Sequence, residues 1–203
     1  TGVSADDPAI QRAMVFLSRT QMLDETNDMP YADGSSQGGF IYATVPNRES
    51  IDGRVGQSQA GEFEETLDDG TNVSRLRAYG SMTYAGFKSL IFADLERDDP
   101  RVVGAARWIR EHYTLDENPG LGDDGLYYYY LTLARALSAW GEDELAPASA
   151  SQPLDWRTDL ITTLASLQNE DGSFTIRSSR WMEDNEILVT AYALLALQEA
   201  LGR

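Results

Sequence analysis

The chain has 203 residues, with 16 basic and 33 acidic side chains and a formal net charge of −17. This charge disfavours nucleic acid as a partner, and the absence of cysteine excludes disulfides, thiolate nucleophiles and cysteine-ligated metals. There is a single histidine, and no apolar run reaches the roughly 18 residues that a membrane span needs. We therefore expect one domain over residues 1–203, with no metal and no cofactor.

Three segments have the apolar spacing of helices that expose one side to water. They cover residues 8–21, a stretch that begins at Asp99-Pro100, and residues 153–168. In the first two, an Asp-Pro pair (Asp7-Pro8 in the first) predicts an N-cap followed by proline at the first helical position. We expect these three helices to form an outer layer.

Three other segments are apolar on all sides. Residues 80–94 carry Lys88 as their only charge before Asp94, residues 126–138 carry only Arg135, and residues 187–197 carry none. Helices of this kind need neighbours on most sides. The alternation of the two kinds predicts an all-α fold, an α/α toroid of about three helical hairpins with apolar inner helices. The toroid is either a small closed ring or half of a larger α/α barrel.

An irregular insertion at about 22–76 interrupts this pattern. It is rich in Gly, Ser, Asp and Glu, and a segment of this length inside a domain often carries a function. The short runs 39–44 and 62–67 are predicted as strands or as parts of a turn-rich flap. Residues 142–152 are typical of a surface linker.

Residues 163–174, TLASLQNEDGSF, resemble the Gln–Trp repeat of the terpenoid cyclases and protein prenyltransferases, with Phe174 in place of Trp. Gln21, followed much later by Gly38-Gly39-Phe40, resembles a second copy opened by an insertion. The stretches YTLDENPG and GLYYYY are similar to bacterial proteins with prenyltransferase/squalene-oxidase repeats, or squalene-cyclase-like proteins. The resemblance covers about 8–21 and 78–201, and it implies a barrel with a central apolar cavity.

The chemistry of that superfamily does not carry over residue by residue. Its squalene-cyclase members protonate substrate from an Asp-x-Asp-Asp motif before an inner helix, whereas only Glu186 is acidic at the corresponding place before Thr190. A lone carboxylate lacks the neighbours that make such an acid strong. The prenyltransferase zinc ligands include a cysteine, which this chain lacks. The resemblance therefore leaves catalysis open.

Candidate site residues lie near the starts of the inner helices. Tyr79, Tyr84, Tyr127, Tyr128 and Trp181 are candidate ligand-binding residues, because aromatic rings can line a cavity for a hydrocarbon, a cation or a sugar face. Packing between the helix layers is the favoured alternative for the tyrosine run 127–130. Two carboxylates, Asp124 and Glu186, are the catalytic candidates, although capping of a helix N-terminus is favoured for the acidic groups at 123–124 and 183–186.

Three functions are compatible with the sequence. The leading hypothesis is a squalene- or terpene-cyclase-like toroid domain that binds an apolar small molecule, an extended polymer or a partner, without the cyclase acid. The second is a polysaccharide-processing enzyme, which needs two carboxylates facing each other across a groove among Asp123, Asp124, Glu183 and Glu186. The third is an extracytoplasmic interaction module that uses the 22–76 insertion as a binding flap. A periplasmic or secreted location is favoured, and an oligomer or a neighbouring domain would complete a larger barrel.

Overall fold

A computed structural model describes residues 7–42, 58–67 and 69–202. This part is mostly helical, as predicted, and none of its helices is both long and apolar enough to cross a bilayer. Its α-helices are α1 (Pro8–Thr20), α2 (Gly80–Phe92), α3 (Pro100–His112), α4 (Leu126–Trp140), α5 (Trp156–Leu167) and α6 (Glu186–Ala200). Shorter elements are the 3-10 helices η1 (Pro30–Ala32) and η2 (Arg180–Met182), and the antiparallel pairs β1 (Glu62–Thr66) with β2 (Asn72–Leu76) and β3 (Glu144–Leu145) with β4 (Leu154–Asp155).

The predicted helix starts at the Asp-Pro pairs are confirmed. Asp7 accepts a hydrogen bond from the backbone N–H of Ala9 at 2.7 Å, and Asp99 accepts one from Arg101 at 2.9 Å. In each case a proline occupies the first helical position, where its missing N–H costs nothing. The side chain of Asp155 caps α5 in the same way, so that this helix begins at residue 156, slightly later than expected.

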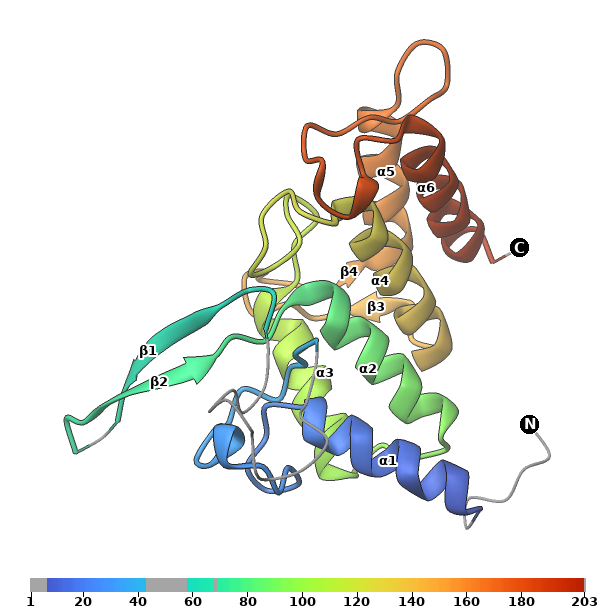
Figure 1. Ribbon diagram of the computed structural model, residues 1–203. Coiled ribbons are helices and arrows are strands. Elements are labelled where there is room, and N and C mark those ends of the chain that lie inside the picture. Colours follow the sequence, from blue (N-terminus) through green and yellow to red (C-terminus); the bar gives the residue numbers. More distant parts are fainter. Residues whose placement is uncertain (1–6, 43–57, 68, 203) are drawn as a thin grey trace.

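Helices α2, α4 and α6 lie side by side in a row (Figure 1). Helix α3 packs against α2, α5 packs against α6, and α1 contacts α2 at one end of the row. Helices α1 and α6 lie at opposite ends, with no extensive contact between them (Figure 1). The described helices therefore form an open row, and they do not close into a small ring.

The three apolar helices differ in how far they are enclosed. Helix α4 is buried over most of its length, including Tyr129 and Leu133, because α2 and α6 flank it. Helix α6 is buried only along Val189, Ala193, Ala196 and Ala200, and Ile187 is 82% exposed. The prediction that 187–197 is enclosed all round is therefore wrong, because the row ends at α6 and its far side has no neighbour among the described residues.

The two copies of the repeat that resembles the Gln–Trp motif are here called Gln–aromatic units. The first, made of Gln21, Gly38 and Phe40, joins the end of α1 to the start of α2. The Gln21 side-chain amide donates to the carbonyl of Gly38 at 2.7 Å and to that of Arg101 in α3 at 2.8 Å. The Phe40 ring is buried, and its backbone N–H donates to the Thr83 hydroxyl at 3.0 Å. This unit thus ties one outer helix to the following inner helix through backbone groups.

The second unit repeats this geometry between α5 and α6. The Gln168 amide donates to the Gly172 carbonyl at 3.0 Å, and the Phe174 N–H donates to the Thr190 hydroxyl at 3.0 Å. Both glycines, Gly38 and Gly172, have a positive φ. Donor and acceptor are 17 residues apart in the first unit and four apart in the second. The internal repetition predicted from the sequence is therefore present in three dimensions, with the first copy opened by an insertion.

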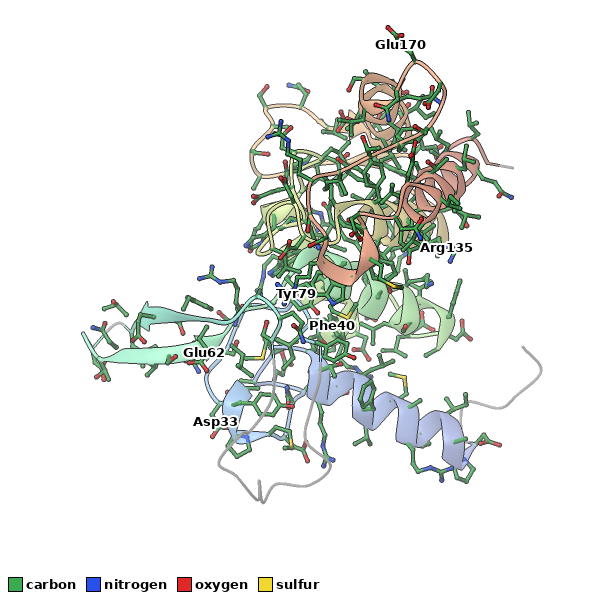
Figure 2. The ribbon with its side chains drawn as sticks, turned by 45° about the horizontal axis from the view of Figure 1, so that its top comes forward. Asp33, Phe40, Glu62, Tyr79, Arg135 and Glu170 are labelled. Carbon is green, nitrogen blue, oxygen red and sulfur yellow. The ribbon has the colours of Figure 1, made fainter. Side chains whose placement is uncertain are left out.

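The 22–76 insertion is partly regular. Its hairpin β1–β2 projects from the helical body, and Figure 2 shows Glu62 on this hairpin. Of the two alternatives for 62–67, the strand is the one observed, as β1 over Glu62–Thr66. In the other run, 39–44, Phe40 forms an isolated antiparallel bridge with Gln21, and no longer strand is present over residues 39–42. Residues 43–57 lie outside the described residues. The linker at 142–152 contains β3.

Candidate functional site

A cavity of about 360 Å³ lies where the N-terminal ends of α2, α4 and α6 meet η2. Five aromatic residues and one carboxylate dominate its lining: Tyr42, Tyr79, Tyr128, Trp181, Tyr192 and Glu183. Tyr79 is almost fully buried and lies near the centre of the molecule (Figure 2), whereas Trp181 is 45% exposed. The cavity therefore has a closed inner end and a partly open rim. Three of the predicted ligand-binding residues, Tyr79, Tyr128 and Trp181, lie together in it.

Three tyrosines around the cavity have hydroxyl groups without a hydrogen-bond partner among the residues that the structure describes. Within the described residues, the hydroxyls of Tyr79, Tyr128 and Tyr192 form no hydrogen bond. Burial, followed by the nearby phenols of Tyr42 and Tyr128, raises the pKa of Tyr79. Burial likewise raises the pKa of Tyr128, next to Tyr192, whose ring centroid lies 5.8 Å away. Neutral phenols therefore line the cavity and can donate to or accept from a ligand.

The other two predicted aromatic residues do not line the cavity. Tyr84 is 1% exposed and packs edge-on against Tyr129 at 5.6 Å, in the core between α2 and α4. Tyr127 is also 1% exposed, packs against Phe174 at 5.8 Å, and burial raises its pKa to about 12. Both belong to the hydrophobic core. For Tyr127 the reason is that α4 carries four successive tyrosines, and a helix turns such a run to all sides.

Glu183 is 1% exposed and reaches across to the start of α4. Its carboxylate accepts the backbone N–H of Tyr128 at 2.9 Å and that of Tyr127 at 3.5 Å. Burial raises its pKa, and the helix N–H groups partly oppose this effect. The N-cap residue of α4 is Gly125, which has no side chain, so the carboxylate of Glu183 supplies the missing cap from another element.

The two catalytic candidates lie outside the cavity lining. Asp124 accepts hydrogen bonds from Ser178 at 2.7 Å and Arg180 at 3.0 Å, and these bonds hold its pKa below the usual value. It does not cap α4, contrary to the expectation for 123–124, because the chain turns left-handed at Gly125 before the helix begins. Glu186 is exposed in the first turn of α6. The N-cap of α6 is Asn185, whose side chain accepts the backbone N–H of Ile187 at 3.0 Å.

Backbone strain is concentrated next to the cavity. Trp181 and Met182 have φ values of 55° and 64°, in the left-handed region that costs a residue with a side chain about 1–2 kcal/mol. A Cβ at Gly125 would lie 3.0 Å from the Trp181 ring, so glycine permits the close approach of the indole. Strain of this kind persists where the surroundings enforce it and is common at binding sites. Here it places Trp181 at the rim and Glu183 beneath α4.

Sequence reasoning missed Tyr42, Gln59 and Tyr192 as lining residues. A usable signal existed for Tyr192, which falls within the first two turns of the last apolar helix, as Tyr128 does within its own helix. No such signal existed for Gln59, because it comes from the insertion and its position depends on the fold. The described residues contain no cluster of three or more metal-ligating side chains.

No family model matches this chain, and neither a curated protein nor a solved structure matches it.

Proposed function

We propose that the chain is a terpene-cyclase-like α/α-toroid domain that binds an apolar or extended ligand in the aromatic cavity. One observation carries the proposal: three tyrosines around the cavity keep their hydroxyls unbonded within the described residues. By contrast, the core residue Tyr129 donates to the carbonyl of Thr114 at 2.8 Å, and Tyr130 donates to that of Leu115 at 2.6 Å. Tyr128 is 36% exposed, so its hydroxyl is open to water or to a ligand. Several unbonded phenols around one cavity offer polar groups that a ligand can reach, and this favours a ligand site.

One core tyrosine also lacks a hydrogen-bond partner. The hydroxyl of Tyr84 is fully enclosed and unpaired, and it lies between α2 and α4 rather than at a cavity. A single free hydroxyl therefore does not define a ligand site. The aromatic cavity differs because several free phenols gather around it, where a ligand can reach them.

The two Gln–aromatic units support the scaffold part of the proposal. Each has a glutamine at the end of an outer helix, a left-handed glycine and a buried phenylalanine whose N–H bonds to a threonine of the next helix. This agrees with the resemblance to the toroid repeat. An open row of three apolar helices, with α1, α3 and α5 packed against it, fits one half of a larger barrel, in which a second copy or a further domain supplies the other wall.

The lining favours binding over hydrolysis of a polysaccharide. Hydrolysis of a glycosidic bond uses two carboxyl groups about 5–10 Å apart, one on each side of the bond. Among the described residues that line the cavity, Glu183 is the only carboxylate, and its oxygens accept helix N–H groups. The other acids, Asp124 and Glu186, belong to an ion pair and to an exposed helix turn. We therefore propose no hydrolytic role.

The experiment is a titration with farnesol, a neutral isoprenoid alcohol, followed by thermal unfolding and tryptophan fluorescence. Saturation at about 100 times the Kd stabilises the folded state by about 2.7 kcal/mol, which raises the Tm of a chain of this size by about 5 °C or more. Met82→Trp fills the cavity from α2 and is expected to abolish the shift. Ile187→Trp is the matched control, because that side chain is 82% exposed. Absence of a shift, or an equal shift in Met82→Trp, would contradict the proposal.

A further inference from the structure

The charges around the aromatic cavity are unbalanced. Among the described residues, Glu183 is the only charged one that lines it, and no Lys, Arg or His does so. The nearest basic residue along the chain, Arg180, donates to Asp124 at 3.0 Å and to Gln59 at 2.8 Å. Arg135, on the same helix as Tyr128, forms an ion pair with Glu199 at 3.4 Å. Both basic groups form their ion pairs with other carboxylates, Arg180 with Asp124 and Arg135 with Glu199, and within the described residues no ion pair neutralises the charge of Glu183.

A buried carboxylate without a counter-ion is costly unless other groups stabilise it. The backbone N–H groups at the start of α4 provide part of this stabilisation for Glu183. They leave its negative potential directed into a cavity of low polarity, where charge–charge interactions are stronger than in water. A cationic ligand would gain from this field, and an anionic one, such as a diphosphate, would be repelled.

The walls of the cavity suit a cation with an apolar surface. Aromatic rings attract cations to their faces through the ring quadrupole, and tryptophan and tyrosine do so most strongly. One such contact is already present, because the Arg180 guanidinium lies 4.3 Å from the centroid of the Trp181 ring. On the other helices, the rings of Tyr128 and Tyr192 form an adjacent pair. A small, strongly hydrated cation would lose too much water here, whereas an alkylated ammonium keeps its methyl groups against the rings.

We propose that the ligand of this cavity is an organic cation of the alkylated ammonium type, held by the aromatic walls and by the carboxylate of Glu183. This inference rests on the proposed function, since it names the charge class of the ligand for the same cavity. It requires no catalytic step. The phenol of Tyr79 at the closed end can bond a polar group on the remainder of the ligand.

The test compares three probes of nearly equal shape by isothermal calorimetry at pH 7. They are choline, its neutral isostere 3,3-dimethylbutan-1-ol and the anion 3,3-dimethylbutanoate. We expect choline to bind at least tenfold more tightly than the neutral isostere, and the anion not to bind. Equal binding of choline and the alcohol would overturn the cation inference and leave the apolar cavity in place. Failure of choline to bind would also overturn it, while the farnesol titration decides the proposed function separately.

Two variants test whether the preference for choline depends on the carboxylate of Glu183. Glu183→Gln keeps the shape of the side chain and removes its charge, so we expect the preference for choline over the alcohol to fall at least fivefold. Glu186→Gln is the matched control, because that carboxylate is exposed and outside the lining. If Glu183→Gln does not fold by circular dichroism, Trp181→Leu provides the second variant and must weaken choline more than the alcohol. Unchanged preference in the folded variant would overturn the assignment.

Discussion

Two glycines in equivalent positions of the repeat predict very different costs for the same substitution. Gly38 and Gly172 both have a positive φ, of 81° and 88°, and both accept a hydrogen bond from a glutamine side chain. A Cβ at Gly38 would lie 2.4 Å from the carbonyl oxygen of Gly104 in α3, whereas the nearest atom at Gly172 is 3.8 Å away. Alanine at 38 thus meets backbone, while alanine at 172 makes an ordinary van der Waals contact with the Gln168 side chain.

The expected magnitudes follow from these environments. At Gly172 alanine introduces only the left-handed backbone penalty, about 1 kcal/mol of unfolding free energy. At Gly38 the same penalty applies, and α3 must in addition move away from the loop, which costs about 2–3 kcal/mol as overpacking does elsewhere. We expect Gly38→Ala to lose about 3–4 kcal/mol in total.

Urea unfolding followed by circular dichroism at 222 nm measures both values from the midpoint and slope of the transition. Wild type and Gly172→Ala serve as the references, and the slopes must agree for the comparison of free energies to hold. Similar losses in the two variants, within about 0.5 kcal/mol, would refute the close approach of the Gly38 loop to α3 as the reason for this glycine.

Two further predictions concern hydrogen bonds. Tyr130→Phe removes the donor to the buried Leu115 carbonyl, and we expect it to lower the free energy of unfolding in urea by about 1 kcal/mol. The hydroxyl of Tyr128 has no acceptor among the described residues, so Tyr128→Phe should change this free energy by less than about 0.5 kcal/mol. The reverse order would contradict the assignment of structural and cavity tyrosines. The second prediction concerns Asp99, whose pKa is held below its ordinary value, chiefly by the Arg101 side chain. Its stabilising effect is therefore present above about pH 4 and is lost as the pH falls through the lowered pKa. Asp99→Asn should be less stable than wild type by about 0.5 kcal/mol at pH 6, and this difference should shrink towards pH 2. A difference that stays constant with pH would show that the charge of Asp99 contributes nothing.

The sequence was sufficient for the local features of the fold. Asp-Pro pairs predict helix starts because capping depends on a few adjacent atoms, and both Asp7 and Asp99 cap as expected. The spacing of apolar residues indicates helices for the same local reason. The spacing does not show on how many sides other helices pack against a given helix. For this reason the enclosure predicted for 187–197 is wrong.

The cavity was predictable in part. Aromatic residues at the starts of the apolar helices pointed to Tyr79, Tyr128 and Trp181, because the ends of packed helices meet at one place. The sequence could not separate Tyr128 from Tyr127, since a change of about 100° around the helix decides which one faces the cavity. It also could not show that Glu183 caps a helix that begins far earlier in the chain, at Leu126, because only the tertiary fold brings these groups together.

The two Gln–aromatic units have a consequence for how the sequence of the chain can vary. In one copy a short turn joins the glutamine to the glycine, and in the other a much longer segment leaves and returns between the same two anchors. The anchors have the same geometry in both, so the helices on either side do not depend on the length of what lies between them. The turn after an outer helix is thus a site where an insertion can be accommodated without changing the packing of the helices.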